Sequence, residues 1–150
     1  MSDPATDMAL LRFDVTAAFE ELPEWNRFQS DLETALAGAI DIDRRLVERE
    51  ARYSRYRAPT AARAPEVRVI FDNRSTTDST IVEVRAPDRG PVLYRVAHAL
   101  AASGVTITCA LVSTLGAEAI DVFYVRQFGG GRVTDPATLE LLREAITATL

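Results

Sequence analysis

The chain has 150 residues, of which 47% are apolar and 26% are charged, as in an ordinary globular domain. No apolar run approaches the roughly 18 residues that a membrane-spanning helix needs, so we expect no membrane partner. The net charge of −5 argues against a nucleic-acid-binding protein, which presents a basic face. The acidic N-terminus lacks the basic region of a secretory signal, and we expect a cytoplasmic location.

The N-terminal piece, residues 1–57, predicts one strand and two helices. The strand is "ALLRFDVTAAF", and the first helix, "LPEWNRFQSDLETALAG", carries an apolar stripe and ends at a glycine. The second helix, Asp41–Arg57, has few apolar positions and a mostly solvated face. Because one strand and two helices cannot bury a core alone, this piece is either part of a second domain or a clasp over the first.

Residues 58–66 are rich in alanine and proline and predict an extended linker. The domain that follows, residues 67–150, gives six elements in the order β-β-α-β-β-α. Alternating or β-branched runs predict the strands, and a period of 3.6 residues predicts the helices. The predicted strands are Val67–Asp72, Ser79–Ala86, Val105–Thr114 and Ala119–Phe128. The predicted helices are Pro91–Ser103, with the stripe Leu93, Val96, Ala97 and Leu100, and Pro136–Leu150, with the stripe Leu139, Leu142, Ile146 and Leu150.

This order predicts an α+β fold of ferredoxin-like type, a two-layer α/β sandwich in which both helices cover one face of a four-stranded sheet. The helix between Ser79–Ala86 and Val105–Thr114 requires those two strands to be parallel. We expect Val67–Asp72 to pair antiparallel with Ser79–Ala86 at one edge.

The last two strands have apolar residues on both faces. In the third strand we assign Val105, Ile107, Cys109 and Leu111 to one face and Ala110 and Val112 to the other. Strands of this kind are usually covered on both sides. A partner domain, a second subunit or the N-terminal piece is therefore expected on the face away from the helices.

The sequence contains no motif for catalysis, for a metal or for a cofactor. It lacks a phosphate-binding glycine loop with its lysine, a G-x-S-x-G elbow and the H-x-x-x-H and C-x-x-C spacings. Cys109 is the only cysteine, and its apolar neighbours predict a small buried side chain. His98, also alone, is poor support for a metal site. "DID" at Asp41–Asp43 is best explained as a helix cap.

The C-terminal motifs resemble an ACT domain, the small-ligand-sensing module of amino-acid metabolism. "FDN..S", "APDR..VLYR", "T.G....DVFYV" and "DP..LE.LREAI...L" are most similar to the C-terminal ACT domain of the bifunctional enzymes that attach uridylyl groups to the nitrogen-regulatory protein PII and remove them. The match is good over Val67–Leu150 and weaker over the N-terminal piece, which resembles part of a preceding ACT domain and a connecting helix. A truncated chain, a gene fragment and a stand-alone protein all fit.

The resemblance implies a regulatory role without catalytic residues. It implies glutamine as the effector, and another ACT domain, the catalytic part of the enzyme and, through it, PII as partners. The effector-binding residues implied are Asp88, Arg89, Gly90, Val92 and Leu93. The family corner D-R-P-G-L-L appears here with glycine and proline exchanged, at Gly90 and Pro91. Proline has no N–H, so one backbone donor for the effector is lost.

Overall fold

The structure is a computed structural model that describes residues 2–3, 8–9, 24–53 and 65–150. The chain divides into two compact units, one of Met8–Ala58 and one of Met1–Asp7 with Pro59–Leu150. Two short strands, β1 (Ser2–Asp3) and β2 (Met8–Ala9), come first in the chain.

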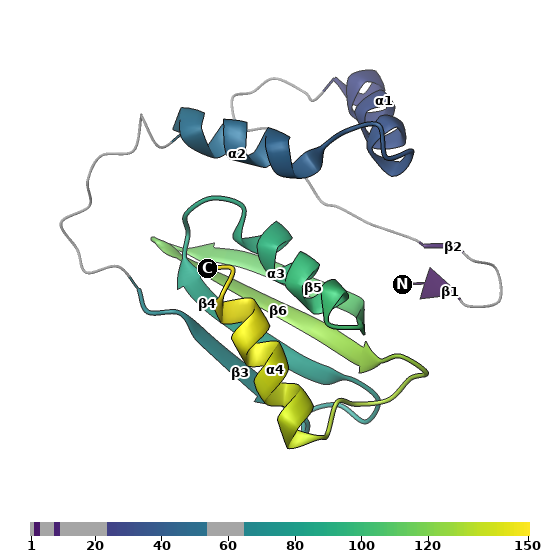
Figure 1. The fold of residues 1–150 in the computed structure, drawn as a ribbon, viewed down its shortest axis with the longest axis vertical. Coiled ribbons are helices and arrows are strands. Elements are labelled where there is room, and N and C mark those ends of the chain that lie inside the picture. The colour runs from purple at the N-terminus through teal and green to yellow at the C-terminus, as the bar shows by residue number, and fades with distance from the viewer. Residues whose placement is uncertain (1, 4–7, 10–23, 54–64) are drawn as a thin grey trace. The chain divides into compact units, whose positions relative to one another are not determined.

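The larger unit contains one four-stranded sheet and two helices, in the predicted order (Figure 1). Its elements are β3 (Arg68–Asp72), β4 (Thr80–Pro87), α3 (Val92–Ala102), β5 (Val105–Leu115), β6 (Glu118–Gln127) and α4 (Pro136–Thr147). The strand order is β3-β4-β6-β5, and all neighbouring strands are antiparallel. β4 and β5 therefore run parallel with β6 between them, and β3 lies at the edge beside β4. Both arrangements confirm the predictions.

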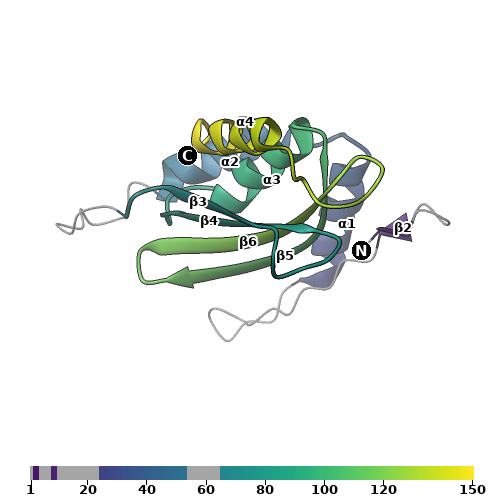
Figure 2. The same ribbon diagram turned by 90° about the horizontal axis from the view of Figure 1, so that it is seen from below.

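Both helices lie on the same face of the sheet, as the view along the sheet in Figure 2 shows. The fold is thus the expected two-layer α+β sandwich of ferredoxin-like type. Alternation along β4 produces the core, because Thr80, Val82, Val84 and Ala86 are buried while the residues between them are partly exposed. β6 follows the same period and buries Ala119, Asp121, Phe123 and Val125 toward the helices.

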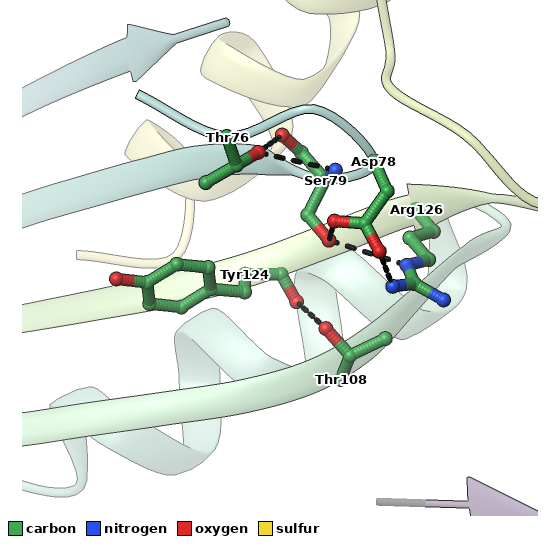
Figure 3. Close-up of polar contacts among 6 residues, drawn as sticks. All are labelled: Thr76, Asp78, Ser79, Thr108, Tyr124 and Arg126. Atoms are coloured by element: carbon green, nitrogen blue, oxygen red, sulfur yellow. Dashed lines mark hydrogen bonds and ion pairs between the residues drawn. The ribbon is translucent and has the colours of Figure 1, made fainter. Parts of the chain in front are cut away.

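β5 contains a β-bulge that the sequence does not predict. The pairing with β6 shifts between Ile107 and Cys109, which leaves Thr108 as the extra residue. The Thr108 hydroxyl donates a hydrogen bond of 3.1 Å to the Tyr124 carbonyl, as Figure 3 shows. Because one residue is added, side chains beyond the bulge change faces. The sequence-based assignment of Cys109 and Leu111 to the face of Val105 and Ile107 is therefore wrong.

The register places Ala110 and Val112 on the helix side of β5, opposite Phe123 and Asp121. Cys109 is exposed, so the prediction of a buried cysteine is also wrong. From Cys109 onward β5 is exposed on both faces, and Leu111 retains 58% of its accessible surface. The expectation that another body covers the second face of the sheet stays a prediction.

The ends of the helices follow from local chemistry. The Asp135 carboxylate accepts a hydrogen bond of 2.9 Å from the Thr138 amide, and Pro136 occupies the first turn of α4, as predicted. α4 buries Leu142 and Ile146, as its stripe predicts. α3 ends before Gly104, whose φ of +77° suits glycine. The α3 stripe is corrected, because its buried residues are Val92, Val96, Ala99 and Leu100, and Leu93 is 42% exposed.

In the smaller unit the described residues form α1 (Trp25–Leu36) and α2 (Ile42–Tyr53). The Asp41 carboxylate accepts a hydrogen bond from the Arg44 amide at 2.9 Å, which confirms that this aspartate caps a helix. α1 has no buried residue, and its apolar stripe is exposed, with the rings of Trp25 and Phe28 in edge-to-face contact at 6.3 Å. The predicted strand "ALLRFDVTAAF" lies almost entirely outside the described residues.

Candidate functional site

The connection between β4 and α3, residues 88–91, is a tight corner held by main-chain hydrogen bonds. The Arg89 amide donates to the Pro87 carbonyl at 2.7 Å, and the Val92 amide donates to the Gly90 carbonyl at 3.1 Å. Gly90 has a φ of +68°, a conformation that glycine adopts without strain. The Asp88 amide donates to the Ala117 carbonyl at 2.8 Å, which ties the corner to the turn between β5 and β6.

The start of α3 has no side-chain cap. Pro91 occupies the N-cap position, and no side chain accepts a hydrogen bond from the first turn, which contains no acidic residue. α2 and α4, by contrast, begin with the aspartate caps described above. The first amides of a helix carry partial positive charge, so the start of α3 is suited to an anionic group. Pro91 removes the donor of the cap position, and the main-chain amides that follow it form the first turn.

The predicted site residues form a continuous segment but differ in exposure. Asp88 is half-buried, and Arg89 and Gly90 are exposed. Val92 is 6% exposed and packs in the core, so its side chain is not available to a ligand, while Leu93 is 42% exposed. The corner can therefore offer a ligand main-chain amides, the Asp88 carboxyl and the Arg89 guanidinium.

Asp121, which lies on β6, is not among the site residues predicted from the sequence. Its side chain is 1% exposed, and its Oδ1 has no hydrogen-bond partner among the described residues. Burial, and secondarily the negative charge of Asp88, raise the pKa of the Asp121 carboxyl above its usual value of 3.8. The influence of Asp88 places Asp121 in the electrostatic environment of the corner.

A signal for Asp121 is present in the sequence. Asp121 is the acidic residue in a row of β6 side chains that otherwise contains Ala119, Phe123 and Val125. Alternation alone places this aspartate on the buried side of its strand, where an acid is rare without a partner. The neighbours of the Asp121 carboxyl are set by tertiary packing, which no local sequence pattern predicts.

The other polar clusters of the larger unit are structural. The Asn73 amide group donates to the Val133 carbonyl at 2.8 Å and accepts from the Thr80 hydroxyl at 2.6 Å, which joins two loops. Arg126 contacts Asp78 and the Ser79 hydroxyl at the start of β4 (Figure 3).

Within the part of the chain that the structure describes, no three His, Cys, Asp or Glu side chains are grouped as metal ligands would be. None of the described helices is long and apolar enough to cross a bilayer.

The known proteins with similar sequences are bifunctional uridylyltransferase/uridylyl-removing enzymes. Over 133 residues, 89% of the chain, the sequence is 38% identical to the bifunctional uridylyltransferase/uridylyl-removing enzyme of Gluconobacter oxydans. Over 121 residues, 81% of the chain, it is 41% identical to the Streptomyces coelicolor enzyme of the same name. The chain matches a region of the bifunctional uridylyltransferase/uridylyl-removing enzymes. This confirms the resemblance to these enzymes that the motifs indicate. No protein-family profile matches the chain.

The match covers most of this chain but little of each enzyme. The Azospirillum brasilense enzyme is 31% identical over 137 residues, and this stretch, like those of the other two, is 14% of the relative. The chain thus spans about one seventh of the bifunctional enzymes it matches. The matched stretches are long enough to include most of both units.

Proposed function

We propose that the chain is an ACT-type regulatory module that binds an amino acid, with glutamine as the first candidate, and has no catalytic residues of its own. The observation that carries the proposal is the uncapped start of α3 beside the corner Asp88–Pro91. Main-chain amides there can donate hydrogen bonds to the carboxylate of an effector. The ferredoxin-like fold and the similarity to bifunctional uridylyltransferase/uridylyl-removing enzymes support the regulatory assignment.

The role proposed for this module is to adjust the balance between attaching and removing uridylyl groups in a bifunctional enzyme of this kind. Its partners are then the catalytic part of the enzyme, another ACT domain and, through the enzyme, the PII protein. The effector-binding residues proposed are Asp88, Arg89, Gly90, Val92 and Leu93, with Val92 contributing its main chain only. The proposed location is the cytoplasm, where these metabolites are sensed.

Calorimetric titration with the common amino acids, glutamine first, tests this function. We expect saturable binding that Asp88→Ala weakens about 10- to 100-fold, the range for loss of a hydrogen bond to a charged group. Asp78→Ala is the matched control, because Asp78 lies just before β4, at the opposite end of that strand from the corner. Absence of binding by any amino acid would overturn the proposal.

A second candidate is an interaction module that pairs with another domain of its own kind and binds no small ligand. The exposure of Leu111 and Leu115 on the edge strand β5 favours it, since exposed apolar edges pair readily. Light scattering should then give a dimer whose mass does not respond to amino acids. A monodisperse monomer at high concentration would exclude this candidate.

A further inference from the structure

Burial of the Asp121 carboxyl in the core is unfavourable in free energy. Asp121 is 1% exposed, and its Oδ1 has no hydrogen-bond partner among the described residues. A buried carboxyl oxygen without a donor loses its hydration and receives nothing in return. Such groups are uncommon in folded proteins, and each one calls for a physical explanation.

The position of Asp121 connects it to the corner. On the helix side of the sheet, Asp121 lies between Val84 of β4 and Val112 of β5. The next pair of residues on the same side is Ala119 with Ala86, and Pro87 and Asp88 follow directly in the chain. The Asp88 charge acts on the Asp121 carboxyl, in agreement with this placement. Asp121 thus lies beneath the helix layer, on the side from which the corner leaves the sheet.

The corner and Asp121 together offer groups of both signs. The uncapped start of α3 and the exposed Arg89 guanidinium provide positive charge. Asp121 and Asp88 provide carboxyl groups. A small molecule with one carboxylate and one ammonium group complements this arrangement, whereas a dicarboxylate or a deaminated acid complements only half of it. Two carboxyls are too few for a calcium site, and the described residues contain no larger cluster.

We propose that Asp121 is the acceptor for the ammonium group of an α-amino acid whose carboxylate binds the first amides of α3. This inference rests on the proposed function and adds to it a specificity-determining residue and a chemical requirement, a free α-ammonium group on the effector. The ammonium group supplies the hydrogen bond that Oδ1 lacks and stabilises the charged form of the carboxyl.

Because Asp121 is buried, an effector reaches it only when the corner moves outward. The corner is joined to the β5–β6 turn through the Asp88 amide and the Ala117 carbonyl. Residues 88–91 contribute few buried side chains, which makes this connection the easiest part of the site to displace. Binding should therefore perturb the amide signals of Asp88 and Gly90 together with the carboxyl of Asp121.

The test compares the wild-type chain with Asp121→Asn and with the control Asp78→Asn, using calorimetry with L-glutamine after a screen of the common amino acids. Asparagine preserves the shape of the side chain and removes its charge. We expect Asp121→Asn to weaken glutamine binding about 10- to 100-fold and Asp78→Asn to leave it unchanged. Glutaramate, which is glutamine without its α-amino group, should bind the wild-type chain weakly and be insensitive to Asp121→Asn.

The possible results separate this inference from the proposed function. If the wild-type chain binds glutamine and Asp121→Asn binds it equally well, the inference fails and the proposed function stands. If the wild-type chain binds no amino acid, both fail. Should Asp121→Asn not fold, the carbon-13 signal of the Asp121 carboxyl in the wild-type chain replaces it. That signal must shift on glutamine addition, and an unchanged signal at saturating glutamine would refute the assignment.

Discussion

The Thr80 hydroxyl accepts a hydrogen bond of 2.8 Å from the Val133 amide, across 53 residues of sequence. Both residues are fully buried. The same hydroxyl donates to the Asn73 side chain at 2.6 Å, and that side chain donates to the Val133 carbonyl at 2.8 Å. Thr80 therefore joins the β3–β4 loop to the segment that leads into α4, and it satisfies main-chain groups that would otherwise be buried without partners.

Thr80→Val should destabilise the domain although it preserves the shape of the side chain. The Val133 amide and the Asn73 carboxamide oxygen would each lose a partner in a buried site, at a cost of about 1–3 kcal/mol in the free energy of unfolding. Urea denaturation followed by circular dichroism measures the change. Thr114→Val, at an exposed position of β5, is the matched control and should be nearly neutral. Equal effects of the two substitutions would contradict a role for this hydrogen-bond network.

Features with a local cause were predictable from the sequence. Asp135 and Pro136 fix the start of α4 through a cap and a preset backbone angle, and both act within one turn. The residue pattern of β4 predicted a strand, and its buried residues alternate as a strand requires. The placement of β3 at the edge beside β4 followed from the need to complete a four-stranded sheet under two helices.

Features with a non-local cause were not predictable. Thr108 is a β-branched residue among others in a strand, so nothing in its neighbourhood marks it as the extra residue of a bulge. That insertion exposes Cys109 and reverses the faces of the following residues. At the start of α3, Val92 and Leu93 are both apolar, and only the crossing of the helix over the sheet decides which one is buried. The corner was predicted by resemblance, whereas the unpartnered Oδ1 of Asp121 becomes visible only after packing.

The Cys109 thiol should react with Ellman's reagent in the native protein, because the residue is exposed on β5. We expect one equivalent to react at nearly the rate of the urea-unfolded chain, and Cys109→Ser to give no signal. A reaction that is slow in the native state and fast after unfolding would mean that this part of β5 is covered in solution. In that case, dilution of the protein would accelerate the reaction if the cover is a second copy.

Gly104→Ala should destabilise the domain through backbone strain alone. The φ of Gly104 is +77°, and a Cβ added there would meet no atom within 4 Å. An L-residue in this left-handed conformation costs about 1–2 kcal/mol. Gly104→Asn is the informative comparison, since asparagine tolerates this conformation better, and its loss in thermal stability should be the smaller of the two. If alanine and asparagine were equally harmless, this glycine would not fix the end of α3.

The pH dependence of stability should carry the sign of the Asp121 shift. Burial and, to a smaller extent, Asp88 raise the folded-state pKa of Asp121 above 3.8, so the folded protein binds this proton more readily than the unfolded chain. The contribution of Asp121 to the free energy of unfolding is therefore lost as the pH rises from about 3.8 through the folded-state pKa. Asp121→Asn removes this loss, and its stability relative to the wild-type chain should increase over that interval and then remain constant.

Asp135→Asn is the control with the opposite sign. The hydrogen bonds from Thr138 lower the pKa of Asp135 below 3.8, so its stabilising effect is lost as the pH falls through the lowered value. The stability of Asp135→Asn relative to the wild-type chain should therefore decrease as the pH rises through the interval below 3.8. Urea midpoints measured at half-unit steps of pH distinguish the two profiles. If the stability difference between Asp121→Asn and the wild-type chain did not change with pH, the Asp121 carboxyl would have a partner in solution. If this pH dependence is present without glutamine and disappears when glutamine is added, the result is the one expected for an ammonium group placed beside Asp121.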